Sequence, residues 1–203
     1  MEIEAKFVAA PAVFDALRRL PALGPFQLIA QADLEVQRNI YYDTADGRMR
    51  ATKHGLRVRQ IGARQIATLK SAATLTDGIA SRGEWEQDVP GNDPQAWPEG
   101  ELRSRVLALI GETPLLPILE METQRQHIYA LRDAARVAEI SLDEGVFVVG
   151  QRREPFQELE VELLEDGQRT NFDALIALLR AQFPLSPEPR SKLERGLMVA
   201  LKR

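Results

Sequence analysis

The sequence predicts an α+β protein in which a closed eight-stranded antiparallel β-barrel carries helices packed outside. Two patterns lead to this prediction. Six short segments alternate charged with apolar residues at the period of two that is typical of β-strands. Amphipathic helical patterns interrupt them and supply apolar faces that need a partner. If the helices cover the apolar side of the strands, the charged side faces inward, and about eight strands enclose room for side chains and one small ligand.

Length and composition describe an ordinary globular chain. With 203 residues, 44% of them hydrophobic and 28% charged, it is long enough to bury a sizeable core, and we expect a single domain over residues 1–203. The net charge of −4 argues against general binding to nucleic acid or to an anionic membrane, because both need a basic surface. Any polyanion would therefore be bound locally. The sequence carries no signal for the oligomeric state.

Cysteine and targeting signals are both missing from the sequence. With no cysteine, disulfides, thiolate metal sites and a cysteine nucleophile are excluded. The two histidines, His54 and His127, lie far apart, so a zinc site is not expected and neither histidine is assigned a role. No charged leader with an apolar stretch precedes the first motif, and no run of 18 apolar residues follows it. We therefore expect a cytoplasmic protein.

The first half of the chain reads as strands with one helix among them. The segment EIEAK begins the first strand, and PAVFDALRRL follows as an amphipathic helix with Pro11 in its first turn. Residues 28–43 read as one long strand ending in a polar turn, and a connection closed by Gly55 follows. The segments LRVRQIG, RQIATLKS and SRGEWEQDV then read as short alternating strands.

The second half begins with a helical insertion at about residues 92–113, where a loop rich in glycine and proline precedes the helix LRSRVLALIGE. Strands are expected at PILEMETQRQHIYAL, RVAEISLDEG, VFVVGQRR and FQELEVELLED, with DEG as a hairpin turn. Two helices end the chain. TNFDALIALLRAQF carries Thr170 and Asp173 at a spacing like that of a capping box, and SKLERGLMVAL carries Ser191 and Glu194.

On each of six predicted strands, alternate residues, which point to the same face, are charged, and the residues between them are apolar or mixed. We call the first set the charged parity and the second the apolar parity. The charged parity comprises Glu2, Glu4, Lys6, Arg57, Arg59, Lys70, Arg82, Glu84, Glu86, Glu139, Ser141, Asp143, Glu158, Glu160 and Glu162. A sheet with one face in water is the simpler explanation, and it is common among antiparallel sheets. Such faces usually mix the two signs, whereas here acids gather with acids and arginines with arginines. This segregation favours a ligand that needs both signs.

The two kinds of charge suit the two parts of one ligand. Carboxylates clustered without histidine suit a hard cation such as Mg²⁺ or Mn²⁺. Lysine and arginine suit phosphate oxygens, arginine through its bidentate fork. The candidates for the phosphate contacts are Arg57, Arg59, Lys70, Arg82 and Lys192. Lys192 lies at the start of a predicted helix, which is itself a favourable place for an anion. The sequence therefore predicts a site for a metal–polyphosphate complex.

Taken in order, these motifs resemble the CYTH superfamily, also called triphosphate tunnel metalloenzymes. The family's N-terminal ExExK hallmark matches EIEAK. The pattern continues over nearly the whole chain through YYDT, LRVR, TLK, SRGEWE, the Arg125 of TQRQ, EISLDEG, ELEVEL and SKLERG. The stretch WPEGEL and the helix after it look most like the bacterial inorganic triphosphatase branch. In that branch a second, helical domain often follows, and because this sequence ends at Arg203 that domain is expected to be absent.

The resemblance implies roles for the matching residues. The metal ligands would be Glu2, Glu4, Glu158 and Glu160, with Asp143 and Glu162 supporting the same or a second metal. The triphosphate would be bound by Arg57, Arg59, Lys70, Arg125 and Lys192, with Arg82, Glu84 and Glu86 completing the wall. Lys6 would lie near the phosphate or the reactive water, which makes Lys6, Glu4 and Glu160 the catalytic candidates. Glu120 and Glu122 have the opposite parity to Arg125 and are expected to face outward.

The implied activity is Mg²⁺- or Mn²⁺-dependent hydrolysis of inorganic triphosphate to pyrophosphate and phosphate. The substrate would be a small-molecule polyphosphate, and no covalent nucleophile is needed. A class IV-type adenylyl cyclase is one alternative, although it needs a pocket for base and ribose that the sequence does not identify. Thiamine triphosphatase and a non-catalytic polyphosphate-binding module are the others, and the retained carboxylates argue against the last.

Overall fold

The computed structural model describes residues 1–201, and in this part of the chain one antiparallel sheet of thirteen strands dominates. The strands are β1 (Glu2–Val8), β2 (Ala22–Leu23), β3 (Phe26–Ala30), β4 (Glu35–Thr44), β5 (Gly55–Ile61), β6 (Arg64–Lys70), β7 (Thr74–Thr76), β8 (Ile79–Arg82), β9 (Glu84–Asp88), β10 (Leu115–Arg132), β11 (Ala135–Val149), β12 (Arg152–Leu163) and β13 (Ser186–Pro187). The helices are α1 (Pro11–Arg19), α2 (Arg48–Ala51), α3 (Glu101–Ile110), α4 (Arg169–Gln182) and α5 (Lys192–Leu201), with a 3₁₀ turn, η1 (Pro94–Ala96), before α3.

The α+β class with antiparallel strands is confirmed, but the predicted closed eight-stranded barrel is wrong. The main path of hydrogen-bonded strands runs β7-β8-β1-β12-β11-β10-β4-β5-β6-β9, and its two ends, β7 and β9, do not pair. The segment SRGEWEQDV, predicted as one strand, breaks at Gly83 into β8, which pairs with β1, and β9, which pairs with β6. A Cβ atom at Gly83 would lie 2.5 Å from the Trp85 ring, so a larger residue there would have to displace that ring.

Two further strand predictions are corrected by the structure. The single strand expected at residues 28–43 is two strands, β3 and β4, which pair with the two halves of β10. The expected hairpin turn at DEG does not exist, because β11 runs straight through it. Gly145 serves close packing there instead: a Cβ atom would lie 2.4 Å from the carbonyl oxygen of Glu122 on the neighbouring strand.

The ends of the last two helices differ in how well the sequence predicted them. Helix α4 begins at Arg169 after Gln168, with no side-chain cap, so the expected role of Thr170 is wrong. The capping box at α5 is confirmed. The Ser191 backbone N–H donates to the Glu194 carboxylate at 2.6 Å, and the Glu194 N–H donates to Ser191 Oγ at 3.1 Å.

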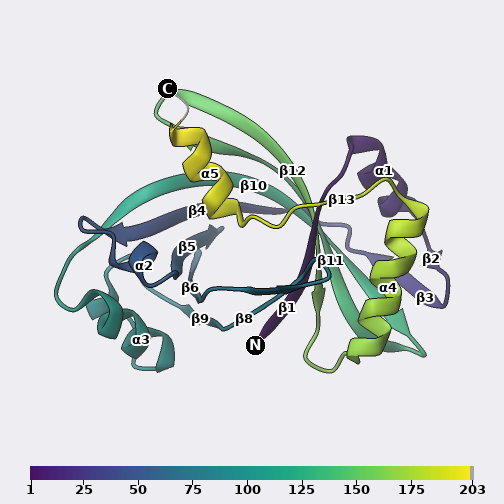
Figure 1. The fold of residues 1–203 in the computed structure, drawn as a ribbon, viewed down its shortest axis with the longest axis horizontal. Coiled ribbons are helices and arrows are strands. Elements are labelled where there is room, and N and C mark those ends of the chain that lie inside the picture. The colour runs from purple at the N-terminus through teal and green to yellow at the C-terminus, as the bar shows by residue number, and fades with distance from the viewer. Residues whose placement is uncertain (202–203) are drawn as a thin grey trace.

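Helices cover the apolar face of the sheet in separate patches (Figure 1). Helices α1 and α4 pack with β1, β11 and β12 in one core, and α2 and α3 pack with β5 and β6 in a second. Helix α5 instead lies on the opposite face of β10 and β11, against Leu119 and Phe147, which share that face with Arg125 and Asp143. The apolar parity of β11 and β12 is fully covered, as Ile140, Leu159 and Val161 illustrate. The charged parity of the same strands must therefore point to the opposite face. Within residues 1–201, no helix has the length and apolarity to cross a bilayer.

Candidate functional site

Strand register places the charged parity of neighbouring strands side by side on one face. Residues directly opposite each other in a ladder share a face of the sheet. On β1, Glu4 is opposite Glu162 and Lys6 is opposite Glu160. The same face continues through the pairs Glu2–Arg82, Glu158–Asp143, Asp143–Arg125, Asn39–Arg59 and Arg57–Thr68. Residues from both ends of the chain thus meet in one continuous surface.

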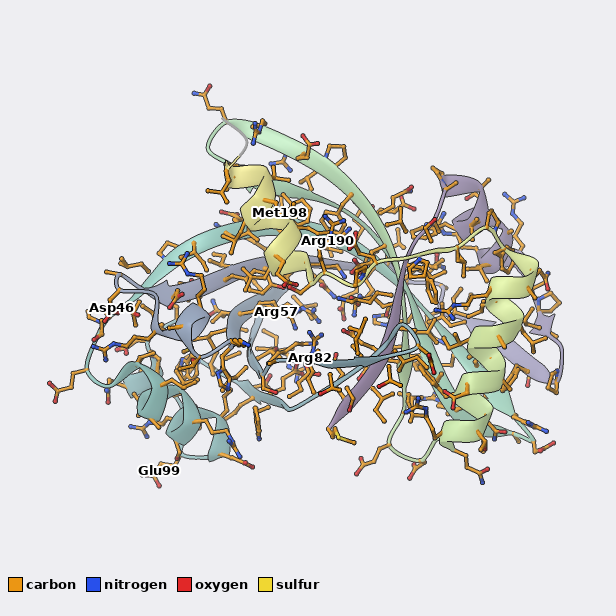
Figure 2. The ribbon with its side chains drawn as sticks, viewed as in Figure 1. Asp46, Arg57, Arg82, Glu99, Arg190 and Met198 are labelled. Atoms are coloured by element: carbon orange, nitrogen blue, oxygen red, sulfur yellow. The ribbon has the colours of Figure 1, made fainter. Side chains whose placement is uncertain are left out.

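This face borders a cavity of about 1310 Å³. Figure 2 places Arg57 and Arg82 in the middle of the molecule and Asp46 and Glu99 at its edge. The predicted site residues that line the cavity are Glu2, Lys6, Arg57, Arg59, Lys70, Arg82, Glu84, Glu86, Arg125, Glu160, Glu162 and Lys192. Glu4 and Glu158 are instead buried behind it, 3% and 0% exposed.

A first acidic cluster consists of Glu2, Glu84 and Glu162, whose carboxylate oxygens lie within 4.8 Å of one another. Lys70 contacts Glu2 at 2.6 Å and Glu84 at 3.3 Å, and Arg82 contacts Glu2 at 2.6 Å. Burial raises the pKa of Glu2, but Lys70 and Arg82 outweigh it and bring that pKa down to about 2. Glu162 has no ion pair within residues 1–201, and burial together with the nearby Glu2 raises its pKa to about 8. This cluster is short of positive charge.

A second acidic cluster consists of Asp143, Glu158 and Glu160, and its charge is balanced. Lys192, at the first turn of α5, contacts all three carboxylates, at 2.9 Å for Asp143 and 2.7 Å for Glu160. Arg125 binds both oxygens of Asp143 and also Glu160, each within 2.7 Å. Arg195 contacts Glu158 and lies over the Phe147 ring. Three cations therefore face three acids, and they tie α5 to the sheet.

Two predicted phosphate ligands have no carboxylate partner within the described residues. Arg59 donates from Nε to the Asn39 side chain at 2.9 Å, and Arg57 donates to Thr68 Oγ1 at 3.2 Å. The Nε atom of Arg57 is buried and has no hydrogen-bond partner in the described part of the chain. Burial, followed by the like charges of Arg57 and Arg125, lowers the pKa of Arg59 to about 9. An anion in the cavity would compensate the positive charge of both guanidinium groups.

Lys6 and Glu4 lie where the two acidic clusters meet. Lys6 donates from Nζ to the carbonyl oxygen of Arg190 at 2.8 Å and lies 4.0 Å from Glu4. Arg82 bridges Glu2 and Glu4, reaching Glu4 at 2.5 Å. Glu4 is in neither three-carboxylate cluster, although burial and the neighbouring Glu160 raise its pKa.

The residues expected to lie away from the site do so. Glu120 pairs with Arg38 at 2.6 Å and Glu122 pairs with Arg153, all four of them half-buried or exposed on the outer face. Arg125, of opposite parity on the same strand, points into the charged face. Glu86 is held at the cavity by a hydrogen bond from Thr68 at 3.0 Å.

The sequence interpretation missed a polar chain that begins at His127. The His127 ring contacts Glu139 at 2.7 Å and Glu35 at 3.9 Å, and because its N–H groups donate to these two carboxylates, its pKa rises to about 9. Gln37 donates to Glu35 at 2.6 Å and accepts from Asn39 at 3.4 Å, and Asn39 in turn accepts from Arg59. The signal was the alternation Glu35, Gln37, Asn39 on β4, which was read as part of an undivided strand.

Comparison with known proteins identifies relatives along the whole chain. The family description "CYTH domain" matches residues 1–197. An inorganic triphosphatase of Haemophilus influenzae is 25% identical over all 203 residues, and the chain spans 56% of that relative's length.

Solved structures share the fold at lower sequence identity. HpAC1 from Hippeastrum, an adenylyl cyclase candidate described as having a dominant triphosphatase activity, superposes with a TM-score of 0.74 at 21% identity, covering 99% of this chain and 97% of that one. The PH1819 protein from Pyrococcus horikoshii superposes with a TM-score of 0.63 at 20% identity, covering 98% and 99%.

Proposed function

The chain belongs to the CYTH domain family, and on that premise we propose that it hydrolyses inorganic triphosphate to pyrophosphate and phosphate with the help of Mg²⁺ or Mn²⁺. The observation that carries the proposal is the pair Arg57 and Arg59. Both line the cavity, and neither has a carboxylate partner within residues 1–201. A polyphosphate would give each guanidinium the charge-assisted bonds it lacks.

A divalent cation fits the first acidic cluster by its donors and its charge. Glu2, Glu84 and Glu162 offer closely spaced carboxylate oxygens, the ligands that a hard cation prefers. With Glu4 beside them, four carboxylates face two cations, Lys70 and Arg82. We propose that Glu2, Glu4 and Glu162, joined by Glu84, hold the metal. When bound, Mg²⁺ or Mn²⁺ would neutralise phosphate oxygens and favour attack by water.

The second acidic cluster, Asp143, Glu158 and Glu160, differs from the first because protein cations already neutralise its carboxylates. Its acids already pair with Lys192, Arg125 and Arg195, so it would accept a second cation only if one of these groups moved. We propose that Lys192 and Arg125 bind phosphate oxygens from this side while remaining held by the acids. Their orientation is then fixed before substrate enters, which reduces the cost of ordering them on binding.

The remaining side chains would orient the triphosphate for in-line attack. Arg57 and Arg59 on β5 and Lys70 on β6 would bind the phosphates that leave together as pyrophosphate. Lys6, fixed by the Arg190 carbonyl, would lie at the reacting phosphate beside Glu4 and Glu160. The low exposure of Glu4 and Lys6 would keep bulk water away from these groups, which strengthens their electrostatic effect.

The relatives support this substrate class without deciding the substrate. The Haemophilus influenzae relative is an inorganic triphosphatase, and HpAC1 is described as a triphosphatase although it was considered an adenylyl cyclase. The deciding experiment incubates the protein with triphosphate, ATP or thiamine triphosphate and with Mg²⁺ or Mn²⁺, and measures phosphate, pyrophosphate and cyclic AMP separately. We expect triphosphate to be the best substrate, and release of cyclic AMP from ATP as the main reaction would contradict the proposal.

Metal dependence is tested in the same assay. Excess chelator should abolish activity, and Mg²⁺ or Mn²⁺ should restore it. Glu4→Gln should lower kcat by orders of magnitude, because it removes one charge at the metal without changing the shape of the side chain. Glu122→Gln, on the outer face of the same sheet, is the matched control and should retain wild-type activity. Full turnover in chelator would exclude a metal role.

A further inference from the structure

The short helix α2 and the turn after it bring three basic residues to one end of the cavity. Arg50, Lys53 and His54 line this cavity together with Arg57. Gly55 follows His54 directly and begins β5, and it shares the inward face of that strand with Arg57. Figure 1 shows α2 beyond β5, on the side away from β1. We call Arg50, Lys53 and His54 the basic rim.

The acids close to the basic rim are already used by other groups. The Asp43 carboxylate accepts backbone N–H bonds from Thr44, Met49 and Arg50, at 2.8, 2.8 and 3.2 Å. Asp46 accepts from Thr44 Oγ1 at 2.6 Å and from Arg48 at 2.9 Å. The side chains of Arg50 and Lys53 are exposed, and neither forms an ion pair within residues 1–201. The rim therefore presents positive charge to the cavity without compensation.

The backbone of the rim provides an independent observation. Lys53 has φ 56°, the left-handed conformation in which helices commonly end on glycine. The geometry is fixed by the Lys53 N–H bond to the Arg50 carbonyl at 3.0 Å and the His54 N–H bond to the Met49 carbonyl at 2.8 Å. A lysine at such a position is strained relative to glycine, and strained backbone tends to occur at functional sites.

The cavity is larger than a triphosphate requires. Pockets that hold a drug-sized ligand measure about 300–1,000 Å³, whereas this cavity measures about 1310 Å³. Its continuation toward α2 is lined by the cations of the basic rim together with aliphatic side chains such as Leu116 and Leu193. The aromatic side chains there, Tyr41 and Tyr42, are 9% and 7% exposed and belong to the apolar cores. The uncompensated cations of the rim therefore favour an anionic occupant at this end of the cavity.

We propose that the basic rim binds the phosphates beyond the third in linear inorganic polyphosphates, so that the site accepts chains of four or more phosphates. This inference rests on the proposed function, because it assumes that three phosphates occupy the place at Arg57 and Arg59. Arg50 and Lys53 contact the additional phosphates, and His54 borders the same path. The rim thereby extends the preference of the enzyme from triphosphate toward longer chains.

Binding of inorganic triphosphate and inorganic tetraphosphate tests the rim, with calorimetry at one fixed concentration of free Ca²⁺ to suppress turnover. The wild-type protein should bind tetraphosphate more tightly than triphosphate. In the double variant Arg50→Gln/Lys53→Gly, the ratio of the two affinities should fall by about tenfold, the loss expected for charge-assisted contacts at an exposed position. Glycine at residue 53 suits the left-handed backbone, so this variant should fold.

A matched control removes two positive charges from the outer face. Arg38→Gln/Arg153→Gln changes the net charge equally and should leave the affinity ratio unchanged. An unchanged ratio in the rim variant, or wild-type protein that binds both ligands equally, would overturn the inference. Triphosphate turnover by the wild-type protein is measured separately. If the wild-type protein does not turn over triphosphate, the proposed function is contradicted. If turnover is normal and the affinity ratio of the rim variant is unchanged, only the role of the rim is contradicted.

Discussion

At the residue scale, the cavity contains two kinds of cationic side chain, those paired with carboxylates and those without a carboxylate partner in the described chain. Lys192 and Arg125 are neutralised by Asp143, Glu158 and Glu160 and hold the fold together. Arg57 and Arg59 have no carboxylate partner within the described chain. Removing a cation of the first kind leaves buried acids without partners and destabilises the protein. Removing one of the second kind should cost binding instead.

Arg59→Met tests this difference. The change should weaken triphosphate binding by about tenfold to a hundredfold, corresponding to the loss of a charge-assisted contact of roughly 1.5–3 kcal/mol. The ligand-free melting midpoint should stay the same or rise, because the change removes a charge that burial and the neighbouring Arg57 and Arg125 disfavour. Arg38→Met, on the outer face, is the control. A large loss of stability with unchanged affinity would mean that Arg59 is structural.

His127 should make stability depend on pH in a defined window. Its pKa rises from an ordinary 6.5 to about 9 because Glu139 and Glu35 bind the imidazolium, against the smaller effects of burial and of repulsion from Arg125. A raised folded-state pKa stabilises the protein fully below about pH 6.5, and this contribution is lost as the pH rises through about 9. His127→Gln should therefore destabilise the protein at pH 6 and much less at pH 10, measured by urea unfolding of both proteins at each pH.

His54→Gln provides the control for that comparison, since the His54 ring contacts Thr52 and no carboxylate among residues 1–201. A destabilisation by His127→Gln that is equal at pH 6 and pH 10 would exclude a role for the charged ring.

His127 also illustrates what the alternation of charged residues could not predict. The alternation of charges correctly placed Glu2, Arg57 and Glu160 on one face, but which cation meets which acid depends on strands distant in sequence.

At the element scale, local signals were reliable where local hydrogen bonds decide the structure. Ser191 and Glu194 cap α5 as predicted, because both partners lie within one turn. The DEG segment was misread because glycine has two uses that look alike in sequence. It permits turns, and it permits close approach of neighbouring groups. At Gly145 the second applies, and the close neighbours are the Glu122 backbone and the Phe156 ring, both remote in sequence.

Gly145→Ala should therefore destabilise the fold even though alanine fits a strand. The added methyl group would meet the Glu122 carbonyl oxygen at 2.4 Å, and overpacking of this kind costs about 1–3 kcal/mol. Gly91→Ala, which has open space around its Cα, should lie within about 0.5 kcal/mol of wild type. Both values come from denaturant unfolding. Equal stabilities for the two variants would mean that β10 and β11 can separate without cost.

At the scale of the whole molecule, the sequence predicted which face is charged but not how the sheet ends. The apolar side chains of the strands need helices on one side, and α1, α3 and α4 cover them in separate patches, whereas α5 lies on the charged face. Closure depends on whether the two terminal strands pair, which no local pattern records. Where backbone strand pairing stops, other contacts join the two sides of the sheet. Lys70 on β6 reaches Glu2 on β1. Ser71 donates its backbone N–H to the Gly83 carbonyl oxygen, and its hydroxyl oxygen accepts from the Gly83 N–H, each at 3.0 Å.

The central claim, that this charged face binds a metal–polyphosphate complex, is tested most directly by the melting midpoint in the presence of Ca²⁺ and triphosphate. Binding to the folded state alone, at a hundredfold excess over the dissociation constant, adds about 2.7 kcal/mol of stability. For a domain of this size the midpoint should rise by roughly 5–10 °C. AMP with Ca²⁺, which lacks the triphosphate, should have little effect. No rise with triphosphate at saturating Ca²⁺, or an equal rise with AMP, would contradict the account.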